Sequence, residues 1–206
     1  LEGKILDIKS AYLNAELDKE IYIMIPTETG LQPAKLNKAL YGLKQAGRLW
    51  NQLLEKEIIK LGWNQCKHTD KCVFWKMSKS GRLMFLAVFV DDIPHFFHKE
   101  DAAEIEKDKA ALARLFTVSD LGDIGGNTTI LNMRVRRDRK AGTLSIDQEA
   151  LILRTLDEYG YTNAKTRSTP MCVGFGKGKP SLIRDVNEGN KHSTINADSF
   201  RAAIGV

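Results

Sequence analysis

The chain has 206 residues, of which 43% are hydrophobic and 28% are charged, so its composition excludes a chain that is disordered throughout. Its formal net charge of +5 suits a polyanionic partner, although a mildly basic solvated surface explains this charge as well. Three cysteines, Cys66, Cys72 and Cys172, leave no fully paired disulfide framework and favour a reducing compartment. No apolar run reaches the roughly 18 residues that a membrane span needs, so we expect no membrane partner.

The first part of the chain predicts a strand, a helix, a second strand and a second helix. Residues 5–8 are apolar except for Asp7 and predict a strand, after which Ser10 is placed to cap a helix N-terminus. The stretch EIYIMIP, residues 20–26, favours a strand that ends at its proline. Apolar residues at helical spacing predict a helix over residues 48–61.

The middle of the chain predicts a hairpin, a weaker strand and a helix. The strands of the hairpin cover residues 72–78 and 83–90, and the second is apolar on both faces, which is typical of a central strand. Residues 93–98 form the weaker strand, and residues 101–116 predict an amphipathic helix with alternating charges outward.

The last part predicts another hairpin over residues 130–136 and 143–146, followed by a helix over residues 148–159. Beyond residue 170 glycine and polar residues predominate, so we expect a linker or a poorly ordered segment. This order of elements predicts an α+β fold in which an antiparallel sheet carries helices packed on one face, with a small helical or irregular C-terminal part.

Acidic residues in apolar surroundings form the first candidate site. Asp91 and Asp92 follow an apolar run, where a pair of aspartates usually marks a turn. Asp7 interrupts a strand where no turn is expected, and a carboxylate there faces solvent, is paired or binds a metal. Carboxylates at the same level on two strands of one sheet would hold two hard cations such as Mg²⁺ about 4 Å apart, an arrangement that assists in-line phosphoryl displacement.

A basic segment before the predicted second helix is another candidate. The stretch KLNKALYGLKQAGRLWNQ carries the basic side chains Lys35, Lys38, Lys44 and Arg48. Gly42 and Gly47 allow close backbone approach, and cations and free amides at a helix N-terminus suit a phosphate. A helix start with a fringe of solvated basic side chains explains the same residues without a ligand.

Three further patterns have simpler explanations. Residues 66–72 alternate cysteine, histidine and aspartate like metal ligands but contain no Cys-x-x-Cys pair, so we do not expect zinc. His95 and His98 lie three apart in a predicted strand, which points them to opposite faces. The stretch GFGKGKPS follows no strand and lacks the glycine spacing of a phosphate loop, so a flexible linker explains it better.

Several motifs, in chain order, resemble those of the reverse transcriptase of copia-type (Pseudoviridae-like) long-terminal-repeat retrotransposons. LDIKSAYLNAELDKEIYI resembles that family's D-V-K-x-A-F-L-N-G-x-L-x-E-E-I-Y-M segment, and KLNKALYGLKQAGRLWNQLL resembles its K-L-x-K-A-L-Y-G-L-K-Q-A-P-R-x-W block. FVDD resembles the Y-V-D-D box, and DLGDIGGNTTILNMRV resembles D-L-G-x-x-x-x-F-L-G-I-E-V. A further segment, LSIDQEALILRTLDEYGYTNAKTRSTPM, resembles L-x-Q-x-x-Y-I-x-x-L-L-x-x-F-x-M ending in S-T-P-M. The match is collinear over the whole chain, which makes it specific at the family level.

The resemblance implies a polymerase palm over residues 1–126, a primer-grip-like hairpin over residues 127–147 and a partial thumb or linker over residues 148–206. It implies a fingers region upstream of Leu1, and the absence of an initiator methionine also indicates a piece of a longer protein. The chain is therefore expected to be inactive by itself.

The resemblance also implies roles for single residues. The catalytic and metal-binding residues would be Asp7, Asp91 and Asp92, with two Mg²⁺ ions, or Mn²⁺ in their place, as cofactors. The nucleotide-binding residues would be Tyr12, Tyr41, Gly42, Leu43, Lys44 and Gln45, among which Tyr12 would block a 2′-hydroxyl. The primer grip would consist of Ile130, Leu131, Asn132 and Met133.

The implied function is that of an RNA-directed DNA polymerase within a retrotransposon Pol polyprotein. Its partners would be an RNA or DNA template with a primer, a dNTP, and the remaining fingers, RNase H and integrase segments of the polyprotein. The implied location is the cytoplasm, in a virus-like particle, and also the nucleus.

Departures from the family pattern leave alternatives open. Gly47 replaces a proline and is expected to loosen the turn before the helix, and Asn132 replaces a glycine, where a Cβ would obstruct close approach. Pro94 cannot donate a ladder hydrogen bond, so we expect the neighbouring acids to be held less rigidly. The first alternative is a decayed copy that folds, binds nucleic acid at most and does not polymerise. The second is an RNA-binding module of related topology, although such modules carry aromatic residues in their central strands where this chain has Asp7, Asp91 and Asp92.

Overall fold

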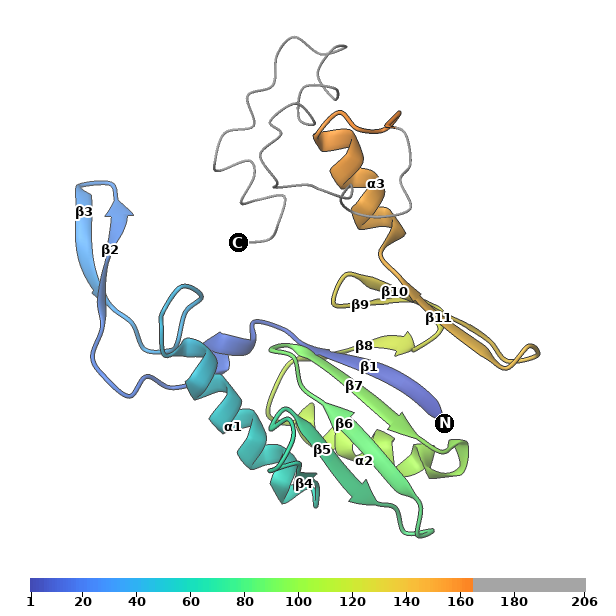
Figure 1. Cartoon of the computed structure of the whole chain (residues 1–206). Helices are drawn as coiled ribbons and strands as arrows, with labels where there is room; N and C mark the ends of the chain where they lie inside the picture. Colours follow the sequence, from blue (N-terminus) through green and yellow to red (C-terminus); the bar gives the residue numbers. More distant parts are fainter. Residues whose placement is uncertain (165–206) are drawn as a thin grey trace. The chain divides into compact units, whose positions relative to one another are not determined.

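The computed structural model describes residues 1–164, and its elements are labelled in Figure 1. The chain divides into two compact units, Leu1–Asp147 and Gln148–Val206. The division into palm, primer-grip hairpin and thumb stays a prediction. The poorly ordered segment predicted beyond residue 170 lies outside the described residues.

The first unit combines antiparallel sheets with helices. Its main sheet has the strand order β4-β5-β6-β7-β1-β8, and neighbouring strands pair antiparallel. The strands are β1 (Glu2–Ile8), β4 (Asn64–Gln65), β5 (Val73–Met77), β6 (Leu83–Ala87), β7 (Asp92–Phe97) and β8 (Val118–Asp123). β6 lies inside the sheet, as its apolar sequence predicted. The sequence did not predict β8, because its residues VSDLGD contain no apolar run. In the structure β8 is an edge strand of the main sheet.

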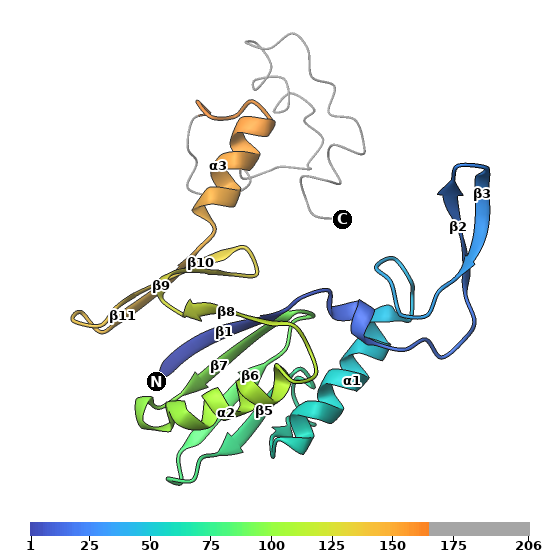
Figure 2. The same ribbon diagram turned by 180° about the vertical axis from the view of Figure 1, so that it is seen from behind.

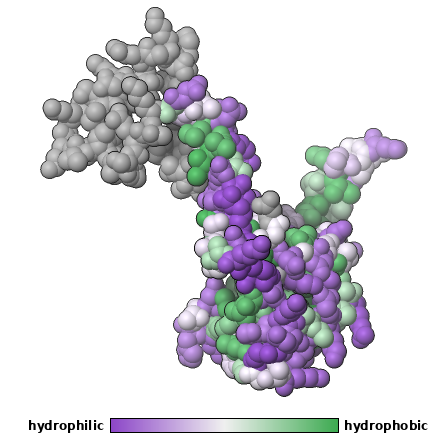
Figure 3. All heavy atoms as spheres, turned by 90° about the vertical axis from the view of Figure 1, so that its right-hand side faces the viewer, coloured by the Kyte–Doolittle hydropathy of each residue, from purple (hydrophilic) through white to green (hydrophobic). Residues whose placement is uncertain are grey.

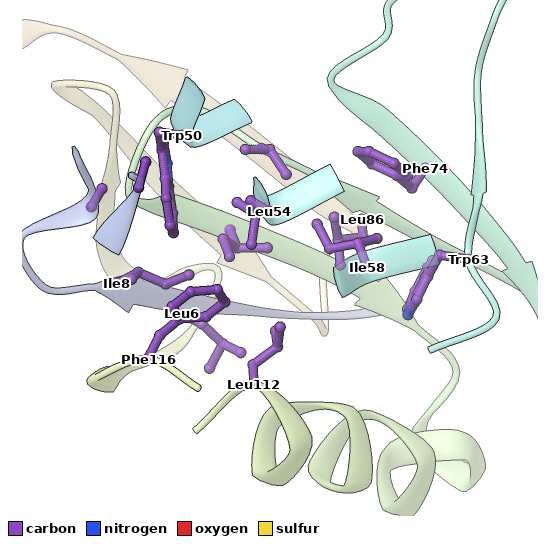
Figure 4. Close-up of a cluster of buried hydrophobic side chains, with 14 of the residues drawn as sticks. Leu6, Ile8, Trp50, Leu54, Ile58, Trp63, Phe74, Leu86, Leu112 and Phe116 are labelled. Atoms are coloured by element: carbon purple, nitrogen blue, oxygen red, sulfur yellow. The ribbon is translucent and has the colours of Figure 1, made fainter. Parts of the chain in front are cut away.

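Helices α1 (Ala46–Lys60) and α2 (Ala102–Leu112) pack on one face of this sheet (Figure 2). Trp50, Leu54 and Ile58 recur at helical spacing and form the buried stripe of α1. Figure 4 shows this stripe against side chains of the sheet and of α2, among them Leu6, Ile8, Phe74, Leu86 and Leu112. The two predicted helices are confirmed, with η2 (Lys99–Asp101), a short 3₁₀ turn, leading into α2.

The alternating side chains of β1 separate the two faces of the main sheet. Leu6 and Ile8 point into the core under the helices, whereas Ile5 packs on the opposite face with Ile124 and Val135. Val135 belongs to a second sheet, with strand order β11-β10-β9, that lies on this opposite face. Its strands are β9 (Gly126–Ile130), β10 (Met133–Asp138) and β11 (Thr143–Asp147).

A separate hairpin joins β2 (Tyr22–Thr27) to β3 (Gly30–Lys35) and stands apart from the main sheet in Figure 1. The strand β2 was predicted, but its partner was not, because GLQPAK contains both glycine and proline. Tyr22, Met24 and Leu31 on this hairpin are more than half exposed. In Figure 3 hydrophobic residues likewise appear at several places among hydrophilic ones on the surface shown.

A single 3₁₀ turn, η1 (Ala11–Asn14), replaces the helix predicted after Ser10. Ser10 has a left-handed backbone with a φ of 53°, and its side chain makes no capping hydrogen bond. Instead, its carbonyl accepts hydrogen bonds from the Leu13 N–H and the Asn14 side-chain amide. The prediction of Ser10 as a helix cap is therefore wrong, since a capping residue needs an extended backbone.

The second unit contains α3 (Glu149–Glu158), which confirms the helix predicted over residues 148–159. None of the helices within residues 1–164 combines the length and the apolar composition that crossing a bilayer would need. The fold is therefore of the predicted α+β class, with antiparallel sheets and a few helices in the part of the chain that the structure describes.

Candidate active site

Asp7 and Asp92 face each other at the ends of two inner strands. Asp7 of β1 pairs with Asp92 of β7, in the register that also pairs Leu6 with Ile93. Leu6 and Ile93 are buried under the helices, so Asp7 and Asp92 both point to the opposite face of the sheet. Directly opposed side chains of an antiparallel pair have Cβ atoms about 5 Å apart. The two carboxylates therefore share one small region.

Asp91 lies in the tight turn between β6 and β7. Phe89 and Asp92 exchange backbone hydrogen bonds of 2.8 and 3.0 Å, which leaves Val90 and Asp91 as the central residues of the turn. Val90 has a φ of 55°, in the left-handed region that a β-branched residue rarely adopts. Such a conformation costs on the order of 1–3 kcal/mol and persists only where the surroundings hold it. The aspartate pair thus belongs to a turn, and Asp92 at the end of that turn pairs with Asp7 of β1.

Two hydrogen bonds from outside hold the Val90/Asp91 turn. The indole Nε1–H of Trp50 donates to the Val90 carbonyl over 2.6 Å. The Ile8 N–H donates to the Asp91 carbonyl over 2.9 Å, which ties the turn to the strand that carries Asp7. Sequence reasoning did not identify Trp50 as part of the site, because its helical spacing indicated only a core position.

The carboxylates at this end of the sheet act on one another. Partial burial raises the pKa of Asp92, and the neighbouring carboxylates of Asp91 and Asp7 raise it further. Burial also raises the pKa of the Tyr41 phenol, with a further contribution from Asp91. Within residues 1–164, no lysine or arginine forms an ion pair with Asp7, Asp91 or Asp92. Their mutual repulsion is therefore not offset by a cationic side chain.

The chemistry of this donor set fits a divalent cation. Carboxylate oxygens are the ligands that Mg²⁺ prefers, and a cation among them would offset the repulsion that raises the pKa of Asp92. In the part of the chain that the structure describes, no three His, Cys, Asp or Glu side chains are gathered in an arrangement able to hold a metal ion by themselves. Asp7, Asp91 and Asp92 thus provide carboxylate oxygens of the kind that bind Mg²⁺, but in the described residues they are not gathered closely enough to hold a metal ion by themselves.

Tyr12 and Tyr41 form an aromatic pair, and the charge of Asp91 contributes to the raised pKa of the Tyr41 phenol. Their ring centroids lie 4.2 Å apart with an angle of 46° between the ring planes. Tyr12 comes from η1 and Tyr41 from the loop before α1. Gly42, the next residue, has a φ of 95°, which favours glycine and lets the loop turn directly after Tyr41. The structure therefore brings these two predicted pocket residues together.

The other predicted pocket residues continue this loop into α1. Leu43 packs against the core under the helices, and Gln45 is the half-buried residue that precedes α1. Lys44 is exposed. Gly47 is the second residue of α1, so the prediction that it loosens a turn before the helix is wrong. A Cβ added at Gly47 would meet only the Tyr12 hydroxyl, at an ordinary distance of 3.8 Å.

Acidic residues neutralise most of the basic segment. Lys35, Lys38 and Arg48 form ion pairs with Glu20, Glu16 and Asp18 respectively. These acids all come from the segment between η1 and β2, which the sequence analysis did not connect with the basic residues. Lys44 has no ion-pair partner within residues 1–164. Of the four cations considered for phosphate binding, Lys44 is therefore the one that carries an uncompensated charge in the described part.

The predicted primer-grip residues form the tip of the hairpin between β9 and β10. Ile130 pairs with Met133, and Leu131 and Asn132 between them have φ values of 50° and 61°. The prediction that residues 130–136 form one strand is wrong, because this two-residue turn places Ile130 and Met133 on different strands. Asparagine adopts the left-handed conformation more readily than most residues, so Asn132 suits its position in the turn.

Pro94 is the third residue of β7 and is buried inside the main sheet. The register that pairs Leu86 with His95 places Pro94 opposite Ala87, where the β6–β7 pairing lapses. A proline has no N–H to donate there, whereas on its other edge β7 pairs continuously with β1 from Asp92 to Phe97. The structure thus accommodates Pro94 by a local gap in one ladder, and looser holding of the acids stays a prediction.

Comparison with known proteins gives consistent matches. Residues 4–173 match a family model described as reverse transcriptase (RNA-dependent DNA polymerase). Over 212 residues the chain is 35% identical to the retrovirus-related Pol polyprotein from transposon TNT 1-94 of Nicotiana tabacum, which covers 100% of this chain and 15% of that protein. Over 178 residues it is 25% identical to a putative transposon Ty5-1 protein of Saccharomyces cerevisiae, covering 81% of this chain and 53% of the relative. Over 112 residues it is 32% identical to the transposon Ty1-GR3 Gag-Pol polyprotein of the same yeast, covering 53% and 6%. The chain therefore spans about half, or much less, of the length of these relatives.

Proposed function

The chain belongs to the reverse transcriptase (RNA-dependent DNA polymerase) family, and on this premise we propose that its first unit is the palm of an RNA-directed DNA polymerase. The proposed reaction is attack of a primer 3′-hydroxyl on the α-phosphate of a dNTP, with pyrophosphate as the leaving group. The observation that carries the proposal is the group of carboxylates, in which Asp7 and Asp92 are paired across adjacent strands and Asp91 lies in the adjoining turn.

Asp7, Asp91 and Asp92 would hold two Mg²⁺ ions, or Mn²⁺ in their place. When bound, these ions would supply positive charge to the attacking and leaving oxygens of the displacement. The carboxylates themselves would orient the primer end and the triphosphate toward each other. The raised pKa of Asp92 supports this role, because it arises from partial burial and from the neighbouring charges of Asp91 and Asp7, which a bound cation would offset.

The aromatic pair supports a nucleotide pocket beside the carboxylates. Tyr12 would lie against the sugar and exclude a 2′-hydroxyl, and Tyr41, Gly42, Leu43 and Gln45 would form the floor of the pocket. Lys44 would attract the phosphates, which its uncompensated charge within residues 1–164 supports. The hairpin tip of Ile130, Leu131, Asn132 and Met133 would grip the primer end.

Two of the three relatives named above are a Pol and a Gag-Pol polyprotein of transposons, which supports a polyprotein context. In this context the template, RNA or DNA with its primer, would bind through phosphate contacts, so its affinity would fall steeply with salt. The proposed neighbours are the fingers, RNase H and integrase segments. The proposed place of action is a virus-like particle in the cytoplasm, with later passage to the nucleus.

Primer extension on poly-rA/oligo-dT with Mg²⁺ or Mn²⁺ tests the proposal. The chain would be assayed alone and with the upstream segment of its polyprotein, each as the natural sequence, as Asp91→Asn and as Asp120→Asn. Asp120 is a matched control because it is also an aspartate of the main sheet but is paired with Lys109. We expect extension that requires the upstream segment, is lost in Asp91→Asn and survives in Asp120→Asn. An extended chain as inert as its Asp91→Asn variant would instead indicate a decayed copy.

A further inference from the structure

The Val90/Asp91 turn carries one of the proposed catalytic aspartates on a backbone that is not stable by itself. Val90 has a positive φ of 55°, although the hairpin turn of this type is suited to glycine, asparagine or aspartate. A β-branched residue in this region is a clear outlier, so contacts from outside the turn must hold it.

Trp50 provides such a contact from a different element of the fold. Its Nε1–H donates to the Val90 carbonyl over 2.6 Å, and the side chain is only 1% exposed. The indole is itself fixed, because its ring meets Phe116 edge to face with centroids 5.3 Å apart (Figure 4). A hydrogen bond from a rigid, buried donor constrains its acceptor more strongly than one from a mobile surface group.

Trp50 also connects the turn to the proposed nucleotide loop. The helix α1 follows the loop that contains Tyr41 and Gly42, and Trp50 lies one helical turn after the start of α1. The Ala46 N–H at the start of α1 donates to the Leu43 carbonyl over 3.1 Å, which ties this loop to the helix that carries Trp50. The bond from Trp50 to Val90 therefore fixes the position of Asp91 relative to the loop that would hold the nucleotide.

We infer that Trp50 is a positioning residue, whose indole N–H holds the Val90/Asp91 turn so that Asp92 stands opposite Asp7 and Asp91 stands in the adjoining turn. The inference rests on the proposed function of these aspartates. The simpler interpretation is that a buried indole N–H only needs some acceptor and that the Val90 carbonyl happens to be in reach. The two interpretations differ in what removal of the N–H does to the turn.

Trp63 is a matched control within the same core. It is also buried, at 2% exposed, and its Nε1–H donates over 2.9 Å, but to the Asp108 carboxylate, away from the turn. Trp50→Phe and Trp63→Phe each remove one indole N–H and the same ring volume. Replacing the Trp50 indole by benzothiophene, which has the same shape but no N–H, separates the hydrogen bond from the loss of volume and serves if Trp50→Phe does not fold.

The first measurement is amide hydrogen exchange on the 206-residue chain. The Ile8 amide donates to the Asp91 carbonyl and the Asp92 amide to the Phe89 carbonyl, so both report directly on the turn. We expect both to exchange about tenfold faster or more in Trp50→Phe and in the benzothiophene variant, but not in Trp63→Phe. Adding Val90→Gly should restore protection in part, because glycine adopts the positive φ without support. Equal exchange in the Trp50 and Trp63 variants would overturn the inference.

The second measurement is steady-state primer extension by the chain with its upstream segment. We expect Trp50→Phe to lower kcat about 10- to 100-fold while KM for dNTP changes less than about twofold, since a shift near 1 Å at reacting groups has this effect. Trp63→Phe should leave kcat nearly unchanged. A wild-type chain that is inert and equal to Asp91→Asn would overturn the proposed function alone. The exchange measurement decides the role of Trp50 in either case.

Discussion

Asp101 and Asp108 of the first unit are buried among partners, whereas Asp7 lies opposite Asp92, with Asp91 in the adjoining turn. The Asp101 carboxylate accepts hydrogen bonds from the Arg82 guanidinium over 2.9 Å and from the Ser80 hydroxyl over 2.7 Å. These contacts hold its pKa at about 2, with Arg82 as the main cause. The Asp108 carboxylate accepts from the Trp63 indole over 2.9 Å and from the Lys76 ammonium over 3.0 Å.

This difference between the two sets of aspartates shows that the same type of side chain serves two purposes in one fold. Asp101 and Asp108 satisfy donors in and around the core. Asp108 joins α2 to β5, and Asp101, the last residue of η2, is bonded to the turn between β5 and β6. The Asp7, Asp91 and Asp92 group stores repulsion instead, because neighbouring carboxylates are held together without a cation from the described residues. Carboxylates that repel one another do not stabilise the fold, and a carboxylate such as Asp92, whose pKa is raised by burial and by neighbouring like charges, is a candidate for function.

The largest expected effect is the loss of activity in Asp7→Asn. Removing one carboxylate of the proposed metal site should lower primer extension by the chain with its upstream segment about 1,000-fold, which corresponds to about 4 kcal/mol. The free energy of unfolding should stay the same or rise, because one of the repelling charges is gone. Steady-state extension and urea unfolding would be measured side by side with Asp120→Asn. A variant that retains full extension would exclude Asp7 from the site.

Asp108→Ala should give the opposite result. It leaves the Trp63 N–H without an acceptor and the Lys76 ammonium without its carboxylate, so the free energy of unfolding should fall by about 3 kcal/mol. Urea unfolding measures this loss. A loss below about 1 kcal/mol would mean that Asp108 stabilises the fold no more than an exposed ion pair does.

His95 extends the comparison to the far side of strand β7. Its side chain is 0% exposed, its Nδ1–H donates to the Ile93 carbonyl, and its Nε2 has no hydrogen-bond partner among the described residues. Burial lowers the pKa of His95 from 6.5 to about 4. Between these two pH values the His95 imidazole therefore binds a proton in the unfolded chain but stays neutral in the folded chain.

Stability should therefore fall as the pH is lowered from 6.5 toward 4, with His95 contributing about 2 kcal/mol between pH 6.5 and pH 5. Urea unfolding across this range should show a slope that His95→Leu removes and that His98→Leu, at a half-buried position, retains. An unchanged slope in His95→Leu would assign the pH dependence to other groups.

The smallest expected effect concerns Asp92→Asn without divalent cations. The raised pKa of Asp92 means that its charged form destabilises the folded chain at neutral pH, and that this penalty disappears as the pH falls toward 3.8. Asp92→Asn should thus raise the melting temperature slightly at pH 7, and the gain should vanish in acid. Mg²⁺ should stabilise the wild type and not the variant. Thermal melts that show no gain at pH 7 would argue against repulsion at this position.

Part of the fold could be predicted because the local pattern and the tertiary environment agree. Trp50, Leu54 and Ile58 give a helix both from their spacing and from their burial. β8 and β9 were missed because neither has an apolar run, and each is defined by its pairing, β8 with β1 and β9 with β10. Ser10 was misjudged because the chain turns there through a left-handed residue, which its side chain does not reveal.

The candidate site was predictable in its residue types but not in its connections. Tyr12 and Tyr41 were named from motifs, whereas their ring contact depends on how η1 and the loop before α1 fold together. The ion pairs that neutralise Lys35, Lys38 and Arg48 bring together segments that lie apart in the sequence, so no local pattern indicates them.

The sequence by itself indicated the α+β class, the family and three candidate aspartates, because apolar periodicity and short motifs are local properties. The tertiary structure alone decided that Asp7 lies opposite Asp92, since this pairing depends on the register between β1 and β7. It alone decided that Val90 has a positive φ and that Trp50 holds it, because the donor and the acceptor lie 40 positions apart. The type of each residue determines that it carries a carboxylate, but the position of each carboxylate follows from strand register and from hydrogen bonds between distant elements.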